Sequence, residues 1–186
     1  MAHETSNIGI DTNNPKPKLK PPFPYFGGKE KQAEWILRVM SRYDFRTYIE
    51  PFGGSGAVLF AKEPSDKEVF SDFNAELFMF YKVLRDPQRY EALIRFIRSL
   101  PCSREMYNES YRLLQSATNL SSIERAGHFY VKIKQSFGGK GTRISRAGWS
   151  TSLNRTGNAD SFYRSIERMP EIHKRLQSVV VEHIPH

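Results

Sequence analysis

The stretch that decides the fold is Tyr48-Ile-Glu-Pro-Phe-Gly-Gly-Ser-Gly-Ala-Val-Leu-Phe60. We interpret it as a short buried strand over residues 47–50, a tight glycine turn over 52–56 and a helix that begins at Ala57. A strand that runs through glycines into a helix places backbone N–H groups beside a bound ligand. The turn lacks the spaced Gly-x-Gly-x-x-Gly of a dinucleotide site, so a glycine turn that binds nothing is the alternative.

Composition narrows the class of protein. The 186 residues suffice for one domain or for a domain with a small insertion. The net charge of +8 favours a polyanionic partner, nucleic acid before membrane, although a basic protein without such a partner is the alternative. Cys102 is the only cysteine, which excludes an internal disulfide and cysteine-clustered zinc and fits a reducing cytoplasm. No apolar run approaches the ~18 residues of a membrane span, so we expect no membrane segment. We also expect no metal.

The N-terminal part has two segments of different character. Residues 1–20 are polar and irregular, and we expect a flexible tail. Pro21-Pro-Phe-Pro-Tyr-Phe-Gly-Gly-Lys29 follows, in which prolines keep the chain extended and the glycines let it turn into a helix near Glu30. Lys29 would then stand at a helix start, where the dipole disfavours a cation unless an anionic ligand offsets it. A solvated lysine is the alternative.

A second short strand is expected over residues 68–72, with Asn74 as the cap of a helix over 75–84. Asp72 therefore lies at the carboxyl tip of a strand, sixteen residues after Gly56. In doubly wound folds an acidic residue at this place reaches the ribose hydroxyls of a nucleoside cofactor. An aspartate that only caps a turn is the alternative.

The alternation of strands and helices stops between Asp86 and about Met169. The segment Phe137-Gly-Gly-Lys-Gly-Thr-Arg-Ile-Ser-Arg-Ala-Gly-Trp149 within it is rich in glycine and cations and indicates a loop or hairpin. Interleaved aromatic and basic residues suit nucleic-acid contact, and a solvated charged loop is the alternative. The expected elements are helices over 87–100, 104–116 and, from the capping box Ser121-x-x-Glu124, to about 136, then a short helix capped by Asp160, a helix from Pro170 to about Gln177 and a buried parallel strand over 178–184.

Four motifs together resemble the Dam-type (D12 class) DNA adenine-N6 methyltransferases in order and spacing. They are Pro24-Tyr-Phe-Gly-Gly-Lys29, Glu50-Pro-Phe-Gly-Gly-Ser-Gly56, Asp72-Phe-Asn74 and Phe129-Tyr followed, after five residues, by Ser136-Phe-Gly-Gly139. The resemblance covers roughly residues 20–184. It implies a Rossmann-like α/β methyltransferase sheet over 21–85 and 170–186, and a helical target-recognition domain over 86–169.

The resemblance also implies S-adenosylmethionine as cofactor and double-stranded DNA as partner. Lys29 would lie near the methionine carboxylate, and the glycine turn would wrap the methionine part. The implied cofactor-binding residues are Tyr25, Gly28, Lys29, Glu50, Pro51, Phe52, Gly53, Gly54, Gly56, Asp72 and Asn74. The implied DNA-binding residues are Lys134, Lys140, Arg143, Arg146 and Arg155. Arg143 and Arg146 are candidates for guanine or phosphate contacts, since arginine can bind guanine through two hydrogen bonds.

One departure from the family pattern concerns catalysis. The family's Asp-Pro-Pro-Tyr, which accepts hydrogen bonds from the adenine amine and stacks on the flipped base, is absent from this sequence. Lys20-Pro21-Pro22-Phe23 only looks similar, because lysine donates hydrogen bonds and cannot replace the aspartate. We therefore expect no catalytic residue in this chain and an incomplete sheet of about three strands. Its first strand would be an exposed edge, so we expect aggregation or a second chain that supplies the other half.

The sequence is compatible with three functions. The first is a site-specific DNA adenine-N6 methyltransferase of a restriction-modification type, incomplete as this chain alone. The second is a non-catalytic DNA-binding remnant or regulatory module that uses the basic insert. The third, an unrelated nucleotide-binding protein, is disfavoured because the Gly-x-x-x-x-Gly-Lys-[Ser/Thr] pattern of an NTPase is missing.

Overall fold

The computed structural model describes residues 19–142, 147–150 and 158–184. Three parallel strands combine with helices in this part of the chain, which confirms the predicted mixed α/β fold with about three parallel strands. The elements in chain order are α1 (Ala33–Met40), β1 (Thr47–Glu50), α2 (Ala57–Ala61), β2 (Lys67–Asp72), α3 (Ala75–Arg85), α4 (Pro87–Ser99), α5 (Arg104–Ser116), α6 (Ser122–Lys134), the 3-10 helix η1 (Phe137–Thr142), α7 (Asn158–Glu167), α8 (Met169–Leu176) and β3 (Val179–His183).

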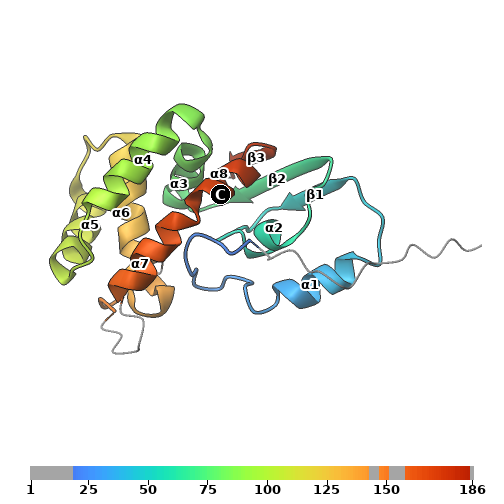
Figure 1. Ribbon diagram of the computed structural model, residues 1–186, viewed down its shortest axis with the longest axis horizontal. Coiled ribbons are helices and arrows are strands. Elements are labelled where there is room, and N and C mark those ends of the chain that lie inside the picture. Colours follow the sequence, from blue (N-terminus) through green and yellow to red (C-terminus); the bar gives the residue numbers. More distant parts are fainter. Residues whose placement is uncertain (1–18, 143–146, 151–157, 185–186) are drawn as a thin grey trace, which may run out of the picture.

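The sheet has the spatial order β1-β2-β3, and helices cover one of its faces. Both connections step in the same direction across the sheet, so right-handed crossovers place their helices on the same side. Side-chain burial agrees, because Tyr48 and Phe70 are buried on that side. On the opposite face, Ile49 of β1 and Val180 of β3 are 62% and 48% exposed. Both residues pair with Val69 of β2, which lies between them. Figure 1 shows α3 to α7 gathered on the left, with the strands on the right.

An aromatic cluster ties the segment before α1 to the helices. Phe23 packs edge-on against Phe80 of α3, with 5.1 Å between the ring centroids, and against Phe129 of α6 at 6.0 Å. Phe80 also stacks on Tyr130 of α6 at 6.1 Å. Edge-to-face pairs contribute about 0.5–1.5 kcal/mol beyond their burial. Because Phe23 precedes Tyr25 by two residues, this packing fixes how the first predicted motif approaches the sheet.

A buried ion cluster anchors the amino end of β2. The Glu68 side chain has 0% exposure and accepts hydrogen bonds from Lys62 Nζ at 2.5 Å and from Arg175 Nη1 of α8 at 2.5 Å. Burial alone would raise the pKa of Glu68, yet the hydrogen bonds from Arg175 and Lys62 hold it below its ordinary value. The cluster therefore fastens α8 to the sheet through a fully ionised carboxylate.

Sequence signals located several helix starts correctly. The Asn74 side chain caps α3 by accepting a hydrogen bond from the Glu76 backbone N–H at 3.0 Å. Ser121 and Glu124 form the predicted capping box at the start of α6. Both caps act within a few residues of the chain, which is why the sequence alone reveals them.

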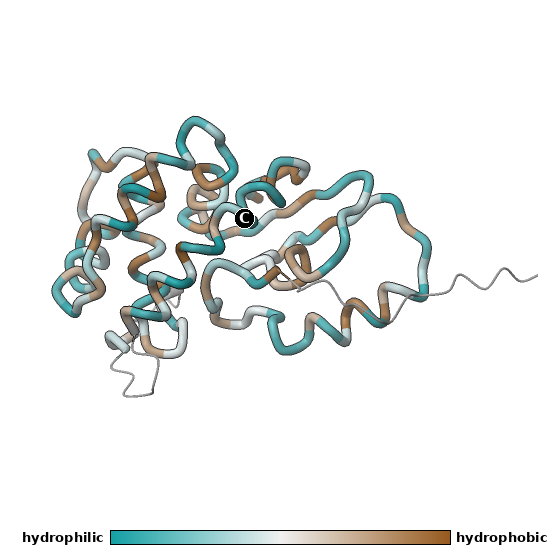
Figure 2. Tube along the Cα trace, in the orientation of Figure 1, coloured by the Kyte–Doolittle hydropathy of each residue, from teal (hydrophilic) through white to brown (hydrophobic). Residues whose placement is uncertain are grey.

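Two predicted helix starts were wrong. α1 begins at Ala33 rather than near Glu30, because residues 30–32 form turns. Asp160 lies inside the first turn of α7, where its carboxylate pairs with Arg164 at 2.9 Å instead of capping the helix. α1 is amphipathic, as Figure 2 shows, because brown apolar residues alternate with teal polar residues along that helix.

The two ends of the glycine-rich segment that follows α6 lie side by side. Ser136 and Trp149 form an antiparallel bridge, and the Phe137 backbone N–H donates to the Gly148 carbonyl at 2.8 Å. The predicted loop or hairpin therefore has closely spaced ends, and its first part is the 3-10 helix η1. Across the described residues, no helix has the length and apolar character needed to cross a membrane.

Candidate functional site

The turn after β1 has a shape that only glycine permits. Gly54 has a φ of +52°, in the left-handed region that glycine tolerates. A Cβ on Gly53 would lie 2.1 Å from the Phe70 ring, and one on Gly54 would lie 2.9 Å from the Tyr25 ring. The glycines thus let the turn pass between the sheet and the first motif.

The hydrogen bonds of this turn differ from the prediction. Its backbone N–H groups were expected to face a ligand, but three of them bond within the protein. Gly53 donates to the Ser71 carbonyl at 2.9 Å, Gly56 donates to the Gly53 carbonyl at 2.9 Å, and Gly54 donates to Asp72 Oδ2 at 2.8 Å. The bonds of Gly53 and Gly54 join the turn after β1 to the end of β2, and the bond of Gly56 closes the turn on itself.

Asp72 organises the carboxyl ends of both strands. One of its oxygens accepts the Gly54 bond, and the other accepts a bond from the Asn74 backbone N–H at 2.9 Å. The Asp72 side chain is buried, and within the described segments it forms no ion pair with a basic side chain. Asp72 therefore fulfils the turn-capping alternative and also borders the cavity described next, with a carboxylate that neutral N–H groups hold in place.

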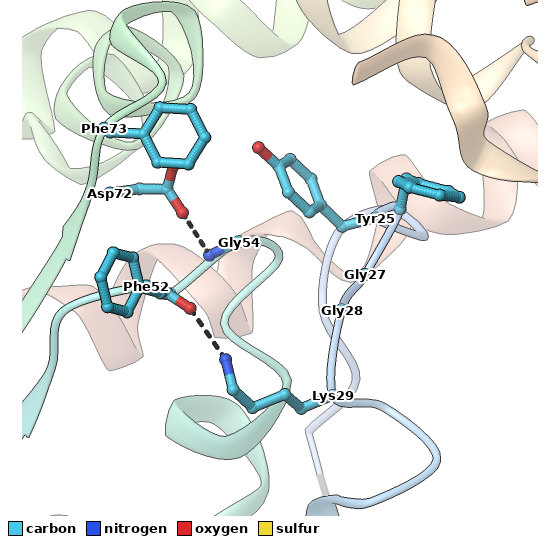
Figure 3. A pocket seen from close by; sticks show the side chains of 10 residues that line it. Tyr25, Gly27, Gly28, Lys29, Phe52, Gly54, Asp72 and Phe73 are labelled. Carbon is cyan, nitrogen blue, oxygen red and sulfur yellow. Dashed lines mark hydrogen bonds between the residues drawn. The ribbon is translucent and has the colours of Figure 1, made fainter. Parts of the chain in front are cut away.

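A cavity of about 270 Å³ opens beside Asp72, between the first motif and the glycine turn (Figure 3). The Lys29 ammonium lies on its floor and donates to the Phe52 carbonyl at 2.9 Å. Lys29 is not at a helix start, because α1 begins four residues later, so the dipole argument for an anionic ligand does not apply. The lining residues are Tyr25, Phe26, Gly27, Gly28, Lys29, Phe52, Gly53, Gly54, Asp72 and Phe73.

The cavity collects seven of the eleven residues predicted to bind the cofactor. The four predicted residues outside the cavity lining are Glu50, Pro51, Gly56 and Asn74. The Asn74 amide donates to the Tyr25 hydroxyl at 3.3 Å. Burial, and next the nearby charge of Asp72, raises the pKa of Tyr25 to about 12, so the phenol stays protonated at neutral pH.

Glu50 is a buried carboxylate directly beneath the turn. It is only 5% exposed and accepts a hydrogen bond from the Tyr48 hydroxyl at 2.8 Å. Burial raises the pKa of Glu50, and the Tyr48 bond and the Lys29 charge offset part of that rise. Glu50 therefore interacts electrostatically with both Lys29 and Asp72 around the turn.

Sequence reasoning missed three lining residues, Phe26, Gly27 and Phe73. Phe73 and Phe52 are 54% and 63% exposed, unusual for phenylalanine, and both stand at the cavity mouth. The available signal was adjacency, since each missed residue directly neighbours a predicted one. An opening flanked by aromatic faces suits a flat ring such as a purine.

The predicted DNA-binding residues are only partly described. Arg143, Arg146 and Arg155 lie outside the described residues. Lys140 lies in η1, with its ammonium 5.9 Å from the centroid of Phe137. η1 packs on the first motif, since a Cβ on Gly139 would come within 2.8 Å of Pro24. Within the described segments, no three His, Cys, Asp or Glu side chains come together as a group that could hold a metal ion.

The fold and the cavity define a class of protein: an open parallel α/β protein with a cavity at the carboxyl ends of neighbouring strands, where proteins of this class bind ligands. Residues 25–179 match the family model of the D12 class N6 adenine-specific DNA methyltransferase, and the chain therefore belongs to that family. It is also 31% identical over 130 residues to the Type II methyltransferase M1.LlaDCHI of Lactococcus lactis subsp. cremoris. The match covers 67% of this chain and 44% of that relative, so the chain spans less than half of the relative's length.

Proposed function

We propose that this chain supplies the donor-binding part of a DNA adenine-N6 methyltransferase that uses S-adenosylmethionine. The observation that carries the proposal is the cavity, which brings residues of three separate family motifs, Lys29, Gly54 and Asp72, to one place. When bound, S-adenosylmethionine provides an electrophilic methyl group on a sulfonium.

The lining residues suit the chemical parts of that donor. The Lys29 ammonium offers a cation for the methionine carboxylate. Asp72 offers carboxylate oxygens, each with room for a second hydrogen bond, to the ribose hydroxyls. Phe52 and Phe73 offer apolar faces to the adenine ring. The carboxylate of Asp72, which lines the cavity, would favour a cationic sulfonium in this region.

The chemistry at the target adenine is proposed to come from a part of the enzyme other than these 186 residues. The sequence contains no Asp-Pro-Pro-Tyr, and the exposed sheet face with Ile49 and Val180 indicates where such a part would pack. Parallel sheets are normally covered on both faces. Strands that extend the sheet beyond β1 would step away from β2, and right-handed crossovers would then bring their helices onto this bare face.

Calorimetric titration with S-adenosylmethionine tests the donor site. We expect Asp72→Ala to weaken donor binding by about 1.5–3 kcal/mol, the range for hydrogen bonds to a charged group. Asp66→Ala is the matched control, because Asp66 is exposed and only pairs with Arg46. Equal affinity of wild type and Asp72→Ala would remove Asp72 from the site.

A methyl-transfer assay on unmethylated duplex DNA tests whether these residues alone can catalyse the reaction. We expect no transfer by the chain alone and self-association in light scattering. If these 186 residues unfold cooperatively as a monomer and methylate DNA unaided, no further part of the enzyme is needed for catalysis, and the proposal is wrong. Salt-dependent DNA binding without any donor binding would instead favour the alternative, a DNA-binding module without catalysis.

A further inference from the structure

A cavity of about 440 Å³ lies between the start of α5 and the end of the glycine-rich segment. It shares no lining residue with the cavity beside Asp72. Its lining residues are Arg104, Tyr107, Asn108, Ala147, Gly148 and Trp149. Among these described residues the only formal charge is the guanidinium of Arg104, so the lining contains a cation and no acid.

Hydrogen bonds hold the wall that the glycine-rich segment contributes to this cavity. The Tyr107 hydroxyl of α5 donates to the Ala147 carbonyl, and the Trp149 indole N–H donates to Gln135 Oε1 at 3.4 Å. The backbone bridge between Ser136 and Trp149 joins the end of the segment to its start. These contacts hold Trp149 beside the first turn of α5.

Arg104 places its guanidinium over the ring of Trp149, 5.4 Å from the ring centroid, which is within the range of a cation–π interaction. The side chain is exposed, and within the described segments it forms no ion pair and no side-chain hydrogen bond. Arg112, about two turns further along α5, differs because its Nε and Nη2 both donate to Glu109. The Trp149 ring therefore positions a cation whose hydrogen-bond donors are open to a ligand.

A second cation lies near the same cavity. Lys140 Nζ is 5.9 Å from the ring centroid of Phe137, and the Phe137 backbone N–H donates to the carbonyl of Gly148, which lines the cavity. Lys134, the other described residue that was predicted to bind DNA, is half-buried in the last turn of α6. Arg104 and Lys140 thus place two cations beside the segment that the family resemblance predicts to face DNA.

We propose that Arg104, positioned by Trp149, binds a backbone phosphate of duplex DNA. The proposal rests on the proposed function, which makes duplex DNA the substrate. A guanidinium over an aromatic ring presents a planar set of N–H donors that matches a phosphate. Arg104 is also the first residue of α5, where the helix dipole favours an anion.

The position of the cavity favours a phosphate over a base edge. It lies where the two ends of the glycine-rich segment meet, because Ser136 and Trp149 form a bridge there. Base edges are reached only inside a groove, whereas phosphate contacts position a protein on the outside of the duplex. The ends of the segment are therefore expected at the DNA backbone.

Duplex binding over a series of salt concentrations tests the contact. We expect Arg104→Gln to reduce the slope of log K against log salt by about 0.9, the loss of one phosphate contact, and to do so on duplexes of any sequence. Arg112→Gln is the matched control on the same helix and should leave the slope unchanged, because Glu109 already pairs with that charge. Thermal unfolding first establishes that each variant is folded.

The outcomes separate this proposal from the proposed function. A changed preference among duplex sequences in Arg104→Gln would mean that Arg104 contacts a base, and the phosphate assignment would be wrong. An unchanged slope and an unchanged preference would overturn the Arg104 site, while duplex and donor binding by the wild type would keep the proposed function. A wild type that binds S-adenosylmethionine but no duplex would overturn the Arg104 site and keep the donor site.

Tryptophan fluorescence gives a second measurement at the cavity itself. The chain has two tryptophans, so Trp35→Phe leaves Trp149 as the only one. In that background, saturating duplex should change the Trp149 emission, and Arg104→Gln should remove most of the change. A bound duplex that leaves the emission unchanged would overturn the site.

Substitution of the ring tests its positioning role. Trp149→Leu should lower duplex affinity about twofold to fivefold, the contribution of an exposed cation–π contact, and keep the salt slope because the Arg104 charge remains. Trp149→Phe should recover part of the affinity. Equal affinities of wild type and Trp149→Leu would show that Trp149 does not position Arg104.

Discussion

The two ends of β2 carry buried carboxylates that differ in their partners. At the amino end, Glu68 is neutralised by Lys62 and Arg175. At the carboxyl end, Asp72 is held by the backbone N–H groups of Gly54 and Asn74, which carry no net charge. The difference separates a structural site from a candidate ligand site, because two cations already compensate the charge of Glu68, whereas Asp72 forms no ion pair with a described residue.

The largest effect is expected from a substitution of Glu68, the carboxylate whose charge two cations compensate. Glu68→Ala leaves Lys62 and Arg175 buried without a counter-charge, and we expect a loss of about 3–5 kcal/mol in the free energy of unfolding. Urea denaturation measures it, with Asp66→Ala as the control at an exposed ion pair. A loss below about 1 kcal/mol would mean that water reaches the cluster and that the two ends of β2 are less different than described.

The next effect concerns the turn that Asp72 holds. Gly53→Ala would place a methyl group 2.1 Å from the Phe70 ring, and overpacking of this kind costs about 1–3 kcal/mol. We expect both stability and donor affinity to fall, measured by denaturation and calorimetry. Gly148→Ala is the matched control, since its Cβ would meet nothing within 4 Å. Normal donor binding by a folded Gly53→Ala variant would show that the turn's shape is not needed for the ligand.

A smaller effect comes from pH. The pKa of Glu50 is raised by burial, so its contribution to stability falls as the pH rises from the ordinary glutamate pKa to the higher folded value. The pKa of Glu68 is lowered by Arg175 and Lys62 despite its burial, so its contribution is lost as the pH falls from the ordinary value to the lower folded value. Each pKa unit corresponds to about 1.4 kcal/mol.

Unfolding free energies measured across the acid range test this contrast. The difference between wild type and Glu50→Gln should grow in favour of wild type as the pH falls, and the difference between wild type and Glu68→Gln should shrink. Parallel pH profiles for the two variants would show that the two buried glutamates have similar environments.

The smallest effect is expected at the cavity mouth. Phe73→Leu keeps an apolar side chain but removes the ring face, and we expect donor affinity to fall by about 0.5–1.5 kcal/mol. Calorimetry with S-adenosylmethionine measures it, and Tyr163→Leu, an exposed aromatic of α7, is the control. A variant that binds the donor as the wild type does would exclude an aromatic contact by Phe73.

The positions of the strands and the caps of α3 and α6 could be predicted because their signals are local, but the predicted burial of the last strand was wrong, since β3 alternates buried with part-exposed or exposed residues at the edge of the sheet. β1 occupies the predicted residues 47–50, and Asn74 caps α3 as expected. The partners of the turn's N–H groups could not be predicted, since the Gly54–Asp72 bond joins residues 18 positions apart in different elements. The Glu68–Arg175 pair spans 107 positions, and no periodicity in either helix or strand indicates such a contact.

The segment around Phe23 has a further consequence. Pro24 packs on Gly139 of η1, while the next residue, Tyr25, lines the cavity proposed to bind the donor. A duplex that displaces η1 would therefore press on a wall of the donor cavity through one residue. Thermodynamic reciprocity then requires that whatever factor DNA imposes on donor affinity, the donor imposes on DNA affinity.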